Sequence, residues 1–187
     1  MENNKKNITN AEIENAVIEF KNGSVEAFTL LYSVFSKPIY RFCFRILNDE
    51  ESAQDAYQET FIRVYERRQT FNGTNFGSWV YAIAHNTCIN YIRKRKHTQS
   101  IGENDYGFHP KHYLKIGLRE HIAEQISKLP LSLQEAVVLK DMEGLPYKDV
   151  AEILGIDLSL AKVRVLRARL KLKELLEPIM KELNETA

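Results

Sequence analysis

Residues 129 to 176 constrain the fold of this chain more than any other stretch. They contain a short amphipathic helical pattern over Tyr147–Leu154, then Gly155-Ile156-Asp157, and then a second helical pattern that runs to about Leu176. Glycine readily adopts the left-handed conformation that ends a helix, and aspartate is a good N-cap for the helix that follows. Two helices joined by so short a turn, with a glycine in it, predict a helix-turn-helix.

The second helix of this motif has two contrasting faces. One face should pack against a core, because its residues recur at spacings of three and four; they are Leu158, Ala161, Val165, Ala168, Leu172 and Leu175. The opposite face carries Lys162, Val163, Leu166 and Arg167, with Arg164, Arg169, Lys171 and Lys173 on its flanks. A solvated amphipathic helix would explain the bases alone. Exposed apolar groups between them favour DNA, where they can meet thymine methyls while the bases reach guanine edges.

The distribution of charge points to more than one partner. The chain has 187 residues, of which 44% are apolar, and this allows one domain or two small ones with adequate cores. Its net charge of +1 hides an asymmetry, because acids predominate from residue 45 to residue 66 while bases crowd into Arg93–Lys96 and Lys162–Lys173. Segregation of this kind predicts separate surfaces for separate partners, at least one of them a nucleic acid.

No secretory signal and no membrane span are expected from the sequence. The first residues lead into no apolar run, and no later stretch approaches the length of a membrane span. The two cysteines, Cys43 and Cys88, lie inside apolar helical patterns, so we expect buried thiols and no disulfide. We therefore expect a cytoplasmic protein with no membrane insertion.

The rest of the chain predicts further helices and no strands. Thr9 to Glu12 fits a capping box that opens a helix to about Phe20, and Ser24 can cap the next helix, with a kink or a break expected at Pro38. A third helix should start at Asn48-Asp49. Ser78 can cap a long helix from Trp79 to about Lys96. We expect an all-α fold.

A change of pattern near residue 98 predicts a domain boundary. Residues 98–113 contain glycines and a proline and show no periodicity, as a flexible linker would. A helix resumes near Leu114 and ends at Pro130, and Ser132 to Glu135 is a second candidate capping box. The predicted architecture is two small helical bundles, residues 1–97 and 114–187, joined by the linker, with the helix-turn-helix in the second.

Motifs in both parts resemble one family. Asp55–Phe61, Phe71–Gly73 and Trp79–Asn86 resemble region 2 of a bacterial RNA polymerase sigma factor. Four further segments resemble region 4 of the same family: Leu129-Pro130, Gly144–Tyr147, Val150–Gly155 and Arg167–Arg169. Because one linker separates the two, the chain resembles the extracytoplasmic function (ECF) group, which lacks the intervening domain. The resemblance covers about residues 24 to 176.

The resemblance implies a set of partners and a role. A sigma factor binds core RNA polymerase at the β′ clamp helices and the β flap, and directs initiation at particular promoters. It reads the −35 element as duplex and the −10 element as a melted single strand. An anti-sigma factor is a further candidate partner. The residues that match the segment binding core polymerase are Asp55, Gln58, Glu59, Ile62 and Arg63.

Two sets of residues correspond to the parts that bind DNA. Reading a melted strand requires stacking surfaces, a pocket for an everted base and cations along the backbone. The matching −10 residues are Phe71, Asn72, Asn75, Trp79, His85, Asn86, Asn90, Arg93 and Lys94. The −35 residues are Tyr147, Lys162, Val163, Arg164, Leu166, Arg167, Arg169 and Lys173. Leu160 and Val163 replace a threonine and a serine of the family pattern, so the preferred −35 sequence cannot be borrowed from relatives.

Two other functions compete with this interpretation. An ordinary helix-turn-helix regulator would bind duplex DNA without polymerase, but it would leave the aromatic and amide residues of 71–96 unexplained. A metal hydrolase could use His109 and His112, but no third ligand stands at a useful spacing. We therefore expect a protein that is not an enzyme and that carries no metal and no cofactor.

Overall fold

The computed structural model describes residues 8–73, 75–99 and 118–185, and every regular element in these ranges is helical. The prediction of an all-α fold is confirmed. The predicted linker falls outside the described residues except at its start, because α4 continues to Gln99. His109 and His112 also lie outside the described residues. Within the described residues, no helix is long and apolar enough to cross a lipid bilayer.

Four helices and one short turn of 3₁₀ helix make up the N-terminal bundle. They are α1 (Asn10–Lys21), α2 (Val25–Leu47), α3 (Glu50–Glu66), η1 (Arg68–Thr70) and α4 (Phe76–Gln99). The Thr9–Glu12 capping box forms as expected, and Ser24 and Asp49 cap α2 and α3 through their side chains. These local signals fix where the helices start, and the apolar stripes of α2, α3 and α4 then pack around Phe42 and Val80, which are fully buried.

Helix α2 is continuous through Pro38, so of the predicted kink or break the break does not occur. One local prediction for this bundle is wrong. Ser78 does not cap α4, because the helix begins at Phe76 and the Asn75 Oδ1 accepts a hydrogen bond of 3.1 Å from the Ser78 backbone N–H. Asn75 is therefore the N-cap, and this frees the Ser78 hydroxyl for another partner.

The C-terminal bundle contains the predicted helix-turn-helix. Its elements are α5 (Leu118–Ser127), α6 (Leu131–Val137), the π-helical segment η2 (Val138–Met142), α7 (Tyr147–Leu154) and α8 (Leu158–Glu185). Gly155 ends α7 with φ of 63°, in the left-handed region. The Asp157 Oδ1 accepts a hydrogen bond of 2.9 Å from the Leu160 N–H and so caps α8. Both predicted ends of the turn are confirmed.

Helix α8 differs from its prediction in length and at one core position. It continues through Pro178 to Glu185, beyond the expected end near Leu176. Of the predicted inner stripe, Ala161, Val165 and Ala168 are fully buried, and Leu172 and Leu175 are half-buried. Leu158, by contrast, is 44% exposed.

The second predicted capping box is also wrong. Pro130 precedes α6, and no side chain caps this helix. The Gln134 Nε2 instead donates to the Arg45 carbonyl oxygen over 2.6 Å, and Glu135 is paired with His85. Both side chains therefore contact the N-terminal bundle and take no part in capping.

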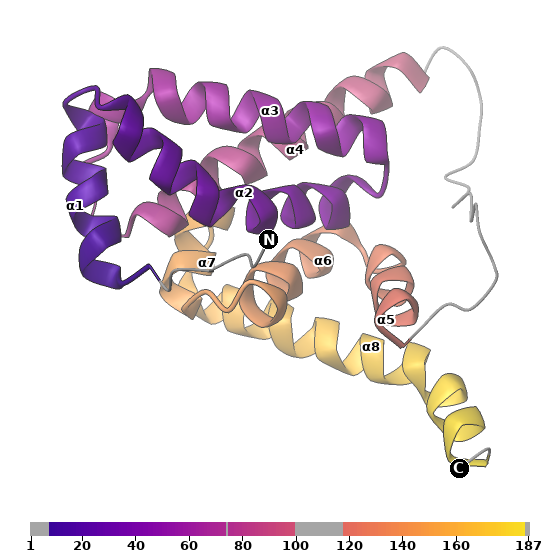
Figure 1. Cartoon of the computed structure of the whole chain (residues 1–187). Coiled ribbons are helices and arrows are strands. Elements are labelled where there is room, and N and C mark those ends of the chain that lie inside the picture. Colours follow the sequence, from indigo (N-terminus) through magenta and orange to yellow (C-terminus); the bar gives the residue numbers. More distant parts are fainter. Residues whose placement is uncertain (1–7, 74, 100–117, 186–187) are drawn as a thin grey trace, which may run out of the picture.

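The two bundles pack against each other. Figure 1 shows α6 and α7 beneath the N-terminal bundle, with α8 extending along the lower edge. Helix α7 contacts α4, and α6, η2 and α5 contact α2. Buried residues of both bundles belong to one hydrophobic cluster, which includes Cys43 and Cys88 as free thiols. A hydrogen bond with Cys43 and burial raise the pKa of the Cys88 thiol.

Candidate nucleic-acid interface

The outer face of α8 presents bases and apolar groups together. Lys162 and Arg167 are exposed, and between them Val163 is 38% and Leu166 is 57% exposed. This face forms because Ala161, Val165 and Ala168 turn inward, so the residues between them must turn outward. Arg164 is half-buried, and Lys173 is exposed further along the helix. The arrangement can present cations to phosphates and apolar groups to base edges in a groove.

Two residues predicted to contact the −35 element have partners within the protein. The Arg169 guanidinium forms a bidentate pair with Asp141 of η2, with N–O distances of 2.8 and 2.6 Å. These hydrogen bonds raise the pKa of Arg169. The Lys140 Nζ lies 4.8 Å from the ring centroid of Tyr147, which is half-buried. Arg169 and Tyr147 therefore join elements of the C-terminal bundle in this structure.

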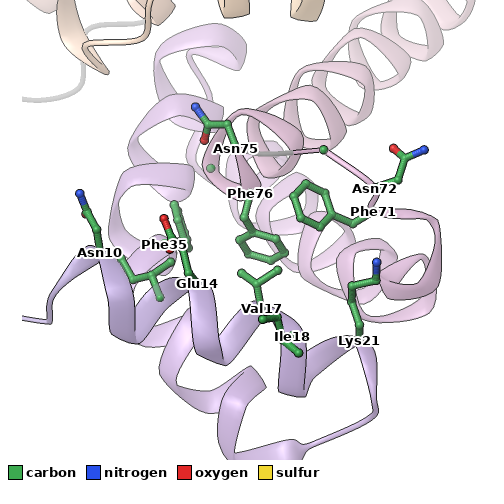
Figure 2. Close-up of a pocket in the computed structure, with 13 residues that line it drawn as sticks. Asn10, Glu14, Val17, Ile18, Lys21, Phe35, Phe71, Asn72, Asn75 and Phe76 are labelled. Atoms are coloured by element: carbon green, nitrogen blue, oxygen red, sulfur yellow. The ribbon is translucent and has the colours of Figure 1, made fainter.

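The loop before α4 borders a cavity of about 560 Å³. Figure 2 shows Phe71 and Phe76 facing Val17 of α1, while the amides of Asn72 and Asn75 point away from the rings. The two phenylalanines are each 6% exposed and pack edge-on with ring centroids 5.4 Å apart. Phe71 was expected among the residues that bind the −10 strand but lies in the core. The cavity thus has an apolar floor and a rim of amides.

The face of α4 predicted to read DNA is only partly open. Asn86, Arg93 and Lys94 are exposed, and Trp79 and Asn90 are half-buried. Lys94 Nζ lies 5.7 Å from the Tyr91 ring centroid. His85 is 8% exposed, and its Nε2 lies 3.0 Å from the Glu135 Oε1 of α6. The expectation that His85 stands on an open face does not hold in this arrangement.

The C-terminal bundle covers the first half of this face. The Tyr81 hydroxyl donates to the Glu143 Oε2 over 2.6 Å, and burial followed by this hydrogen bond raises the pKa of Tyr81. The Asp149 Oδ2 accepts a hydrogen bond of 2.8 Å from the Asn75 Nδ2 and a second from the Ser78 hydroxyl. Tyr81 and Asn75 are therefore held by acids of the other bundle.

Helix α3 presents the acidic face predicted to bind core polymerase. Asp55 and Gln58 are exposed, and Ile62 is 58% exposed. Glu59 and Arg63 form an ion pair one turn apart on the same face. Beside it lies a hollow of about 550 Å³ lined mainly by aromatic side chains: Phe28, Tyr32, Tyr57, Phe61 and Tyr65. This face combines charge with exposed apolar surface, as protein interfaces do.

Comparisons with known proteins assign both halves of the chain. Residues 31–98 match the family model of sigma-70 region 2, and residues 119–172 match the model of sigma-70 region 4. The ECF RNA polymerase sigma factor SigM of Bacillus subtilis is 30% identical over 78% of this chain and 92% of its own length. The chain belongs to the ECF group of RNA polymerase sigma factors. It directs promoter-specific initiation of transcription by binding core RNA polymerase and promoter DNA.

Further relatives of this sigma factor match it almost from end to end. RNA polymerase sigma-H factor of Pseudomonas aeruginosa is 29% identical over 94% of this chain and 99% of its own length. Among solved structures, the sigma factor RpoE in complex with the anti-sigma factor NepR from Bartonella quintana is 25% identical. That structure has a TM-score of 0.69, and the match covers 82% of this chain and 98% of the solved one. The ordinary helix-turn-helix regulator is thereby set aside.

Sequence reasoning missed the acids that join the two halves of the sigma factor. Glu135 directly precedes the apolar run of residues 136–139, where an acid is poorly explained as a solvated residue, and Glu143 follows four residues after that run. The Glu143 side chain is 3% exposed. The sequence around Asp149 gives no sign of a distant partner. Asp149 stands in the first turn of α7, where an acid is favourable in any case.

Proposed function

We propose that region 4 of this sigma factor reads the −35 element in the major groove with the outer face of α8. The observation that carries this assignment is the exposure of Lys162, Val163, Leu166 and Arg167 on the side opposite the buried Ala161 and Val165. Arginine makes bidentate hydrogen bonds to guanine, and apolar groups contact thymine methyls. Arg164 and Lys173 contact the flanking phosphates. Arg169 and Tyr147 can contact the DNA as well only if they give up the contacts they make within region 4.

Region 2 binds the melted −10 strand, in this proposal, with the loop before α4 and the exposed side of that helix. The cavity beside the loop has the apolar floor and amide rim that an everted base needs, and Asn72 and Asn75 belong to its lining. Trp79, Asn86 and Asn90 follow along α4, and Arg93 and Lys94 supply cations for the strand's backbone. Phe71 supports the loop through its packing in the core. His85 becomes available to DNA only when region 4 moves.

Helix α3 docks on the β′ clamp helices of core polymerase. This assignment is supported by the outer face of α3, which lies next to an aromatic hollow and carries Asp55, Gln58, Glu59, Ile62 and Arg63. Region 4 binds the β flap of core polymerase in this proposal. Residues 1–97 and 114–187 are the two functional domains, with residues 98–113 as the linker. The protein acts in the cytoplasm, and the polymerase supplies all the chemistry of RNA synthesis.

An anti-sigma factor is a further partner in this proposal. The solved sigma factor RpoE, which is similar over nearly its whole length, is bound to the anti-sigma factor NepR. This chain offers apolar surface for such a partner on α3 and α8, where Ile62 and Leu166 are among the most exposed large apolar side chains of the described residues.

The assignment of α8 is tested with Arg167→Ala and Lys173→Ala in holoenzyme bound to a library of −35 sequences. Arg167→Ala should relax the preference at one position, because a bidentate contact supplies about 1–3 kcal/mol of discrimination. Lys173→Ala, the matched control, should weaken all sequences alike and lower the salt slope by about one unit. If Arg167→Ala also weakens all sequences equally, Arg167 contacts the backbone and the assignment fails.

A further inference from the structure

The Asp149 carboxylate of region 4 sits directly on the loop end of α4. Its Oδ2 accepts a hydrogen bond of 2.8 Å from the Asn75 Nδ2, and it accepts a second hydrogen bond from the Ser78 hydroxyl. Asn75 can donate because its Oδ1 faces the other way and caps α4. One acidic side chain thus engages two donors at the N-terminal end of a long helix, where the helix dipole also favours a negative charge.

A second set of contacts extends the same interface along α4. The Tyr81 hydroxyl, one turn from Ser78, donates to the buried Glu143 carboxylate over 2.6 Å. His85, one turn further, lies against Glu135 at 3.0 Å. Asp149 of α7, Glu143 directly after η2 and Glu135 of α6 therefore follow one stripe of α4, next to the exposed Asn86.

This stripe overlaps the surface assigned to the melted strand. Asn75 and His85 belong to the proposed −10 set, and each is occupied by a carboxylate of region 4. A DNA strand presents anionic oxygens and base acceptors, which seek the same donors. Asp149 and a −10 strand therefore compete for the Asn75 amide.

We propose that Asp149 is an internal latch that holds region 4 over the −10 surface of the free sigma factor, so that the strand binds only after region 4 moves away. The proposal rests on the assignment of the loop and α4 to −10 DNA. When only a small fraction of the molecules can bind a ligand, the apparent affinity falls in proportion to that fraction. Weakening the latch should therefore tighten binding of the strand. In this proposal, binding of region 4 to core polymerase and to the −35 element releases the latch.

The test uses the full chain without polymerase. Asp149→Asn preserves shape and removes the charge of the latch. Glu152→Gln is the matched control, because Glu152 is an exposed acid on the same helix. Dyes on introduced cysteines at the exposed positions Glu51 and Lys173 report the distance between the regions by energy transfer. A labelled short single-stranded DNA of mixed sequence reports strand binding by fluorescence anisotropy.

Asp149→Asn should lower energy transfer and tighten strand binding roughly tenfold, the size expected for loss of a charged hydrogen bond. Glu152→Gln should change neither. Ser78→Ala removes the other side of the contact and should lower energy transfer as well. Unchanged transfer in Asp149→Asn and Ser78→Ala would overturn the latch itself. Lower energy transfer without tighter strand binding would also overturn the proposal. It would show that the surface uncovered by the movement of region 4 is not the −10 site.

Discussion

The Glu143 carboxylate lies 2.6 Å from the Arg45 guanidinium, although the two residues are 98 positions apart in the chain. Glu143 belongs to region 4 and Arg45 to α2 of region 2, and the Tyr81 hydroxyl of α4 donates to the second carboxylate oxygen. The Glu143 side chain is 3% exposed and that of Arg45 is 21% exposed. This contact joins region 4 to two helices of region 2 at once, in addition to the Asp149 contact.

Glu143→Gln should destabilise the packed arrangement. The neutral amide keeps the shape but loses the charge that Arg45 and Tyr81 face, which should cost about 1–3 kcal/mol in the free energy of unfolding. Urea titration followed by circular dichroism measures this change. Glu152→Gln, which removes an exposed acid from the same region, is the control. Equal stability of both variants and the wild type would show that Glu143 does not hold the two regions together.

Asp49 should make the stability of region 2 depend on pH. Hydrogen bonds from Ser52, and then the Arg95 guanidinium, hold the pKa of Asp49 below its ordinary value of 3.8. A carboxyl whose pKa is lowered in the folded state stabilises the protein above its unfolded pKa, and this stabilisation is lost as the pH falls through the folded pKa. Asp49→Asn still caps α3 but cannot titrate.

The advantage of the wild type over Asp49→Asn should therefore be constant near neutral pH and should shrink below about pH 4. Free energies of unfolding of the two proteins, measured from about pH 7 to about pH 3, give this difference directly. A difference that stays constant throughout the acid range would show that Asp49 is not stabilised as an anion.

Reversing the charges of Asp55 and Glu59 to lysine should weaken binding to core polymerase roughly tenfold or more, because an acidic face would then repel a basic partner. Co-purification and fluorescence titration with core polymerase measure the affinity. The same reversal at Glu19 and Glu152, which are exposed elsewhere, is the control. Wild-type affinity of the Asp55 and Glu59 variant, with unchanged circular dichroism, would remove α3 from the polymerase interface.

Asn86→Ala should reduce strand opening more than initial binding to duplex DNA, because a residue that reads an everted base acts only after the strand has melted. Asn86 is exposed in the structure, beside the half that region 4 covers. A permanganate footprint of the transcription bubble reports opening, and Gln54→Ala on α3 serves as the control. An unchanged footprint would mean that the base is read by other residues.

Local chemistry explains which parts of the fold the sequence predicts well. Gly155 and Asp157 define the turn of the helix-turn-helix without help from distant residues, and the alternation of Ala161, Val165 and the bases defines the faces of α8. These features depend on neighbours within one or two helical turns. They were predicted correctly for that reason.

The two wrong capping predictions involve residues whose partners lie far along the chain. Ser132 to Glu135 has the composition of a capping box, but Glu135 gains more from His85 across the interface. Likewise the Ser78 hydroxyl binds Asp149, and Asn75 takes over the cap. Helical periodicity cannot show that one bundle covers the polar face of another, since that face has the same pattern whether water or protein lies against it.

The most direct test of the account is transcription by core polymerase that lacks any other sigma factor. Purified protein is added to this core on a library of genomic fragments, and the 5′ ends of the transcripts are sequenced. The account predicts initiation at a defined set of sites, each preceded by a common −35 and −10 pair, and loss of that set with Asn86→Ala or with the double reversal at Asp55 and Glu59. Transcripts no more specific than those of core polymerase alone would contradict it.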